Sequence, residues 1–217
     1  MTDISERLAA TAAAYDAAAA RYAAFVAGEL HELPLDRAVL AAFAEHVRAA
    51  GGLTADLGCG QGRIGAHLAG LGLDVIGADL SPALLAIGRD AYPRLRFAAA
   101  SMHALPLPDG ALAGIVAWHS LIHAAPGDLP GYFAEFARVL RPGGYLLAAF
   151  FEADPGPVTA FDHKVTTAYR WPAGELAALA AAAGFAEAGR MSREPGTDER
   201  FRRGHLLLRR GPAEGAA

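Results

Sequence analysis

The sequence predicts an α/β fold built on a doubly wound parallel sheet, and three observations support this prediction. Apolar stretches of strand length alternate with helical patterns from residue 53 to residue 151, which is typical of a parallel sheet with right-handed crossovers. The first strand runs straight into a glycine-dense turn, Gly58-Cys-Gly-Gln-Gly62, and the second ends in a carboxylate, Asp79. Ligands of open α/β sheets bind outside the carboxyl ends of the strands. We therefore expect the turn and the carboxylate to face one site.

Two helices are expected before the sheet. Residues 3–28 are rich in alanine and carry Tyr15 and Tyr22 seven positions apart, which puts both rings on one helix face. A second helix begins near Pro34, because proline suits the first helical position, and it ends at Gly51-Gly52.

The remaining elements follow from apolar periodicity and from proline and glycine stops. Strands are expected at 53–57, 73–79, 95–99, 112–118 and 145–151, and helices at 63–71, 82–92 and 129–140. The alternation changes after residue 151. The connection 152–171 is expected to be a long loop, a helix follows at 172–183, and strands at 185–193 and 201–209 come without a helix between them.

The spacing of the glycines separates this turn from the dinucleotide-binding fingerprint. That fingerprint is Gly-x-Gly-x-x-Gly, whereas the third glycine here arrives one residue early, and Asp79 lies seventeen residues beyond it. In the motifs Asp56-Leu-Gly-Cys-Gly-Gln-Gly62 and Asp74-Val-Ile-Gly-Ala-Asp79, the sequence resembles the class I methyltransferases that use S-adenosylmethionine. The turn Val139-Leu-Arg-Pro-Gly-Gly144 is also similar to one often seen in that family.

This resemblance covers most of the chain and carries expectations about its architecture. It implies a Rossmann-like, seven-stranded sheet in the order 3-2-1-4-5-7-6, with the last strand antiparallel and an N-terminal helical cap. We expect one domain, made of cap helices at 1–52, a core at 53–210 and a flexible tail at 211–217.

The resemblance also implies S-adenosyl-L-methionine as cofactor. In that family the glycine turn lines the methionyl part and the ribose, and the acid after the second strand accepts hydrogen bonds from the ribose hydroxyls. Serine at position 101 departs from the acid that many relatives have there. The cofactor-binding residues implied are Tyr22, Asp56, Gly58, Cys59, Gly60, Gly62, Arg63, Asp79, Leu80, Ser101, Met102 and Trp118.

Candidates for catalysis and acceptor binding lie after the fourth strand and in the long connection. His119 and His123 leave the fourth strand at the edge where an acceptor should meet the methyl group, and a histidine can take a proton near neutral pH. Tyr15 could place its ring or hydroxyl near the sulfonium. The long connection also contains a set of aromatic residues. They either line a pocket for an apolar or cationic acceptor or pack against the edge of the sheet. This group comprises Phe161, His163, Tyr169 and Trp171.

Composition excludes several partners. A net charge of -4 and a pI near 6.0 give no broad basic surface for nucleic acid or an anionic membrane. No uncharged apolar run reaches the roughly 18 residues of a membrane span, and no secretory signal is apparent, so a cytoplasmic location is expected.

The single cysteine, Cys59, fits the turn as a small residue. Histidine and acidic residues lack metal-ligand spacing, so no metal is expected.

The sequence thus predicts a methyltransferase, monomeric or homodimeric, that methylates oxygen or nitrogen of a small-molecule acceptor. A role in secondary metabolism is implied by the resemblance alone. Three alternatives stay open: an oxidoreductase using NAD, which the glycine spacing disfavours, a module that binds S-adenosylmethionine without transferring the methyl group, and a methyltransferase that acts on proteins.

Overall fold

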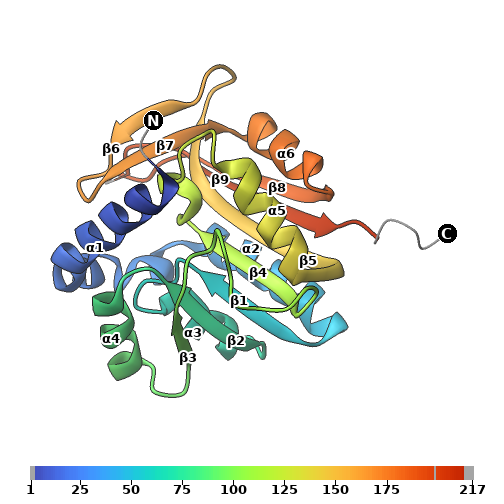
Figure 1. Cartoon of the computed structure of the whole chain (residues 1–217), viewed down its shortest axis with the longest axis horizontal. Helices are drawn as coiled ribbons and strands as arrows, with labels where there is room; N and C mark the ends of the chain where they lie inside the picture. Colours follow the sequence, from blue (N-terminus) through green and yellow to red (C-terminus); the bar gives the residue numbers. More distant parts are fainter. Residues whose placement is uncertain (1–2, 198, 213–217) are drawn as a thin grey trace.

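The computed structural model describes residues 3–197 and 199–212, and within them nine strands form one mixed sheet (Figure 1). The strands are β1 Leu53–Leu57, β2 Asp74–Asp79, β3 Arg96–Ala99, β4 Leu112–Trp118, β5 Leu140–Ala153, β6 Thr159–Asp162, β7 Thr167–Pro172, β8 Phe185–Arg193 and β9 Arg203–Arg210. The α-helices are α1 Ile4–Val26, α2 Pro34–Ala50, α3 Arg63–Gly70, α4 Pro82–Ala91, α5 Leu129–Val139 and α6 Ala173–Ala182. Short 3₁₀ turns span Glu29–Glu32 and Leu121–His123.

The order of the core strands is the one predicted. Strands β3, β2, β1, β4 and β5 lie side by side and parallel. Strand β9 pairs antiparallel with β5 over Tyr145–Phe151, and β8 pairs antiparallel with β9. With β8 and β9 counted as the sixth and seventh core strands, the order is 3-2-1-4-5-7-6. The Rossmann-like fold class is therefore confirmed.

Helices cover both faces of this sheet because its central strands are apolar on both sides. Along β5, Leu146, Ala148 and Phe150 belong to one core, which contains α5 and α6. The alternating positions Leu147 and Ala149 belong to a second core, which contains α2 and α3. The period-2 alternation of a strand thus supplies two cores from one apolar run.

The connection after β5 differs from the expected loop, because it contains a hairpin. Strands β6 and β7 pair antiparallel, and β7 also pairs with the end of β5 over Phe151–Ala153. Threonine and aromatic residues occupy every second position in 159–161 and 167–171, which favours such strands. The tail expected at 211–217 lies, from residue 213 onward, outside the described residues. None of the described helices has the length and apolar character needed to cross a membrane.

Candidate active site

The glycine turn between β1 and α3 forms the floor of a pocket at the carboxyl edge of the sheet. The backbone amides of Gly58 and Cys59 donate to the carbonyl of Ala78 at 2.7 and 3.1 Å, which ties the turn to β2. Gly58 has φ +70°, and a Cβ atom there would lie 2.3 Å from the Cβ of Ser120. Glycine is therefore required at this position. Cys59 is buried, and burial raises the pKa of its thiol well above the usual value, so the thiol is protonated at neutral pH.

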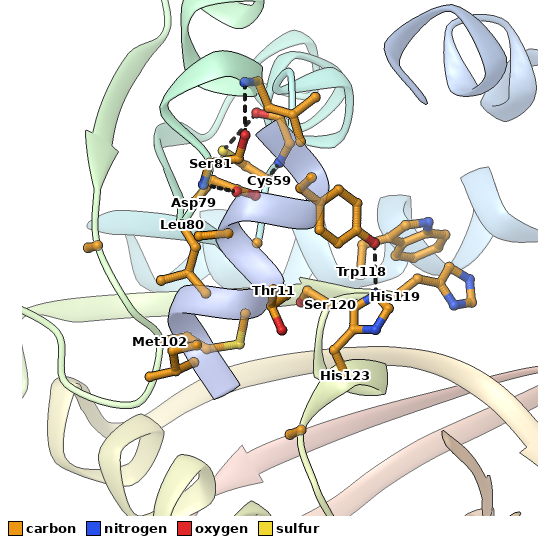
Figure 2. Close-up of a pocket in the computed structure, with 18 of the residues that line it drawn as sticks. Thr11, Cys59, Asp79, Leu80, Ser81, Met102, Trp118, His119, Ser120 and His123 are labelled. Atoms are coloured by element: carbon orange, nitrogen blue, oxygen red, sulfur yellow. Dashed lines mark hydrogen bonds between the residues drawn. The ribbon is translucent and has the colours of Figure 1, made fainter. Parts of the chain in front are cut away.

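Asp79 is held at the end of β2 by two backbone amides. Its Oδ2 accepts from the amide of Gly60 at 2.7 Å and its Oδ1 from the amide of Ser81 at 2.8 Å. Burial raises the pKa of this carboxyl, while the amide hydrogen bonds oppose the shift. Because each carboxylate oxygen can accept more than one hydrogen bond, Asp79 remains an oriented acceptor on the pocket wall (Figure 2).

Asp56, at the end of β1, orients the start of α3 instead. Its Oδ2 accepts from the amide of Gly65 at 2.8 Å, and its buried Oδ1 has no hydrogen-bond partner among the described residues. Burial raises the pKa of this carboxyl to about 7. Gly62 faces β3 rather than the pocket, because a Cβ atom there would lie 2.6 Å from the ring of Phe97. Its left-handed φ of +86° lets the chain enter α3.

Helix α1 covers the pocket and is attached to its walls by polar contacts. The carboxylate of Asp16 accepts from the hydroxyl of Ser81 at 2.5 Å and from the amide of Ala83 at 3.1 Å, at the start of α4. Nearer the amino end of α1, Arg7 forms an ion pair with Asp128 at 2.6 Å. Few side chains of α1 are buried, namely Ala18, Ala19 and Val26.

Tyr15 of α1 and His123 form a hydrogen-bonded pair across the pocket. The Tyr15 hydroxyl lies 2.7 Å from Nε2 of His123, whose Nδ1 lies 2.8 Å from the carbonyl of Thr167. A carbonyl only accepts, so Nδ1 carries the proton and Nε2 accepts from the tyrosine. Burial lowers the pKa of His123 and raises that of Tyr15 well above its usual value. At neutral pH the pair is a neutral imidazole and a neutral phenol.

His119 stands at the end of β4 with a left-handed φ of +52°, which is uncommon for a residue with a side chain. Its amide donates to the carbonyl of Ala149 at 3.0 Å, and its ring centroid lies 5.1 Å from that of Phe151. Burial is the main cause of a pKa well below the usual histidine value. His119 is therefore a neutral imidazole at neutral pH.

Two pockets meet at the site. The first, here called the turn pocket, lies over the glycine turn beneath α1. The second, here called the aromatic pocket, lies between α1, the β6–β7 connection and the start of β9. Tyr22, Arg63 and His119 line both, so the two spaces are adjacent. Figure 2 shows Asp79, Leu80 and Met102 on one side of the turn pocket and His119 and His123 on the other.

Most of the sequence-predicted residues lie at these pockets. In the turn pocket are Tyr15, Tyr22, Asp56, Gly58, Cys59, Gly60, Arg63, Asp79, Leu80, Met102, Trp118, His119 and His123. Phe161 and His163 line the aromatic pocket. Gly62, Ser101, Tyr169 and Trp171 line neither. Trp171 is 3% exposed and packs in the core beside α6, so the expected aromatic wall is only partly formed by the residues predicted for it.

The sequence reasoning missed a group at the start of the last strand. Arg200, Phe201 and Arg203 line the aromatic pocket, together with Phe151 from β5. Strand β9 is antiparallel to its neighbours, so its first residues lie at the carboxyl edge of the parallel strands. The antiparallel direction implied by the resemblance is the signal that could have located them.

Comparisons with known proteins agree with this geometry. Residues 55–144 match the family model described as methyltransferase domain. This stretch of the chain, which holds the glycine turn and Asp79, is thus similar to a methyltransferase domain. A demethylmenaquinone methyltransferase of Beutenbergia cavernae is 36% identical over 100 residues, which are 46% of this chain and 41% of that protein. The chain thus matches about two fifths of the length of this curated relative.

Solved structures share the fold over more of the chain. The 1,6-didemethyltoxoflavin N1-methyltransferase of Burkholderia thailandensis, solved with 1,6-didemethyltoxoflavin and S-adenosylhomocysteine, superposes with a TM-score of 0.73 at 21% identity, covering 97% of this chain and 92% of that one. A 4+2 cyclase superposes with a TM-score of 0.67 at 20% identity, covering 81% of each chain. At such identities the likeness shows the fold alone.

Proposed function

We propose that this protein transfers a methyl group from S-adenosylmethionine to a small molecule. The observation that carries the proposal is the Asp79 carboxylate, fixed by the amides of Gly60 and Ser81 at the rim of the glycine turn. A ribose diol offers two hydroxyl donors, and an oriented carboxylate is a suitable acceptor for both. Gly60 leaves the space that the ligand needs, because a Cβ atom there would come no nearer than 3.9 Å to Leu84 or Tyr22.

The other residues of the turn pocket suit the remaining parts of the cofactor. Leu80 and Met102 are apolar and lie on the Asp79 side, where an adenine ring would pack against them. Arg63 and Tyr22 lie where the two pockets meet and can pair with the methionyl carboxylate. Ser101 and Gly62 line neither pocket and have no direct role in this proposal.

The transfer itself makes few demands on the side chains. When bound, S-adenosylmethionine supplies an electrophilic methyl group: a lone pair of the acceptor forms the new bond to carbon while the carbon–sulfur electron pair returns to sulfur. The chain mainly aligns the two reactants in a pocket that excludes water. A proton lost by an oxygen or nitrogen acceptor can pass to the hydroxyl oxygen of Tyr15 while the tyrosine proton moves to Nε2 of His123, which accepts from that hydroxyl. We place the body of the acceptor in the aromatic pocket and its reacting atom where this pocket meets the turn pocket, at His119.

The fold by itself does not decide between transfer and other activities, since a 4+2 cyclase has the same fold. Transfer is favoured because the family match covers the glycine turn and Asp79. A small-molecule acceptor is favoured because the relatives are named for demethylmenaquinone and 1,6-didemethyltoxoflavin. Methylation of oxygen or nitrogen within secondary metabolism remains part of the proposal.

Calorimetric titration with S-adenosylmethionine, S-adenosylhomocysteine and NAD tests the cofactor assignment. We expect the first two to bind, and Asp79→Ala to weaken both at least tenfold, because charge-assisted hydrogen bonds are lost. Asp74→Ala is the matched control, since Asp74 lies at the other end of β2 in an exposed ion pair with Arg96. Binding of NAD alone would contradict the proposal. Binding without production of S-adenosylhomocysteine over a panel of phenols, amines and carboxylic acids would favour a non-catalytic module.

A further inference from the structure

The aromatic pocket has walls suited to a flat, apolar molecule. The rings of Phe161 and Phe201 lie 4.9 Å apart between centroids, and Phe151 lies 5.2 Å from Phe161. Helix α1 contributes Phe25 to the lining, and its side chain is 82% exposed. Such an exposed aromatic at the mouth of a cavity is available for contact with a ligand.

The charges around this pocket are strongly one-sided. Among the described residues, five basic side chains line it, against a single acid, Glu199. Glu199 is already engaged, because it accepts from both terminal nitrogens of Arg193 at 2.5 and 2.8 Å and from Arg203 at 3.2 Å. The hydrogen bonds from Arg193 and the nearby cations lower the pKa of Glu199 to about 2, so it remains ionised but compensated. The five basic residues are Arg21, Arg63, Lys164, Arg200 and Arg203.

Part of this positive charge has no carboxylate partner in the part of the chain that the structure describes. Among the described residues, no carboxylate forms an ion pair with Arg21, Lys164 or Arg200. The guanidinium of Arg200 donates to the carbonyl of Asp162 at 3.1 Å and stands 5.0 Å above the centroid of Phe201. Those contacts fix its position at the aromatic wall without cancelling its charge. The chain as a whole carries -4, so the positive pocket is a local feature.

A concave, apolar site with excess positive charge concentrates anions and repels cations. We propose that the acceptor of this enzyme is a planar, largely apolar molecule with an anionic group, such as a carboxylate or a phenolate. Its ring system packs among Phe151, Phe161 and Phe201, and its negative group pairs with Arg200 and Lys164. This inference rests on the proposed function for the identity of the ligand as acceptor. It also replaces the cationic acceptor that the sequence left open.

Two fluorescent probes that share one ring skeleton distinguish the contribution of the basic residues to binding from that of the aromatic wall. 8-Anilinonaphthalene-1-sulfonate is anionic, whereas N-phenyl-1-naphthylamine lacks the sulfonate and is neutral. Titrations use the full chain with saturating S-adenosylhomocysteine. The test variant is Arg200→Gln with Lys164→Gln, and the charge-retaining variant is Arg200→Lys with Lys164→Arg. The matched control, Arg94→Gln with Arg209→Gln, removes the same charge from exposed residues that line neither pocket.

We expect the neutralising variant to bind the anionic probe about tenfold more weakly and the neutral probe within twofold of the wild type. The charge-retaining and control variants should bind both probes as the wild type does. Phe161→Ala should weaken both probes alike, since it removes part of the shared aromatic wall. Equal loss of both probes in the neutralising variant, no loss of the anionic one, or no effect of Phe161→Ala would each overturn the inference.

The same titrations distinguish this inference from the proposed function. If S-adenosylhomocysteine binds but the neutralising variant binds the anionic probe as tightly as the wild type does, the cofactor assignment stands and the anionic acceptor is wrong. If S-adenosylhomocysteine fails to bind while the charge-dependent binding of the probe persists without it, the aromatic pocket binds anions and the methyltransferase function is wrong.

Discussion

The hydrogen bond between Tyr15 and His123 joins residues that lie 108 positions apart in the chain. Its polarity is set by a third group, the carbonyl of Thr167, because that carbonyl fixes the proton of His123 on Nδ1. The lone pair of Nε2 then faces the hydroxyl of Tyr15. A single backbone carbonyl on β7 thus determines which nitrogen of His123 can receive a proton in the turn pocket.

Tyr15→Phe should raise the pKa of His123. The tyrosine hydroxyl donates to the neutral imidazole, and a hydrogen bond to the neutral form lowers the pKa of a base. Its loss, worth about 1 kcal/mol net, should shift the pKa upward by about 0.7 unit. The imidazole is the base form above its pKa, so the acid limb of the kcat profile, expected below pH 6.5, should move to higher pH. The resonances of the histidine ring in NMR titrations check the same shift.

Tyr92→Phe is the control for this change, because Tyr92 ends α4 and lines neither pocket. An unchanged acid limb in Tyr15→Phe, with kcat at its plateau also unchanged, would exclude His123 as the proton acceptor. The remaining candidate would then be His119, whose pKa burial holds well below the usual histidine value.

Between elements, a buried charge cluster fastens α2 to the last two strands. Asp36, in the first turn of α2, accepts from Nε of Arg193 on β8 at 2.7 Å and lies 3.4 Å from Nε2 of His205 on β9. Burial raises the pKa of Asp36, but the hydrogen bonds and charges of His205 and Arg193 outweigh it and leave the pKa below its usual value. The carboxylate therefore stays ionised in a site that is 1% exposed.

Asp36→Ala should lower the free energy of unfolding by about 3 kcal/mol, because it leaves Arg193 and His205 without their buried partner. The value falls at the low end for such a loss, since Glu199 still holds Arg193. Urea denaturation at pH 7 measures it. Asp74→Ala, which breaks the exposed pair with Arg96, should cost less than 1 kcal/mol. Equal effects of the two substitutions would show that the cluster contributes no more than a surface ion pair.

The individual elements were largely predictable, whereas the contacts between them were not. Proline at position 34, glycines at 51 and 52 and the apolar strands mark helix and strand limits locally, and the structure confirms them. The β6–β7 hairpin was mistaken for a loop, because its alternating pattern is short and its pairing with β5 is a tertiary contact. No local sequence pattern predicts the pairing of Asp36 with Arg193, which lies 157 positions away.

For the whole molecule, topology decides which residues reach the site. The glycine turn and Asp79 were predictable because parallel strands always end at one edge of the sheet. Arg200 and Phe201 reach the same edge only because β9 runs against its neighbours. Their place in the aromatic pocket therefore depends on strand direction, not on local pattern. For Trp171 the sequence left open a place in the pocket wall or packing against the sheet, and its ring packs in the core.

Helix α1 lies over both pockets, which predicts that their ligands bind cooperatively. It contributes Tyr15 and Tyr22 to the turn pocket and Tyr22 and Phe25 to the aromatic pocket, yet few of its side chains are buried. A ligand that orders α1 in one pocket should reduce the entropic cost of ordering it for the other. We expect about fivefold tighter binding of 8-anilinonaphthalene-1-sulfonate in the presence of saturating S-adenosylhomocysteine.

Thermodynamic coupling between two ligands is reciprocal. S-adenosylhomocysteine must therefore bind tighter by the same factor when the probe is saturating. Calorimetry in both orders measures the two factors. Asp16→Ala removes the contacts of α1 with Ser81 and Ala83, so the free helix should be less ordered and the coupling larger, and amide hydrogen exchange along α1 should be faster before ligand is added. Independent binding of the two ligands, with α1 equally protected in the free and bound protein, would mean that the helix is a fixed wall and that each pocket fills on its own.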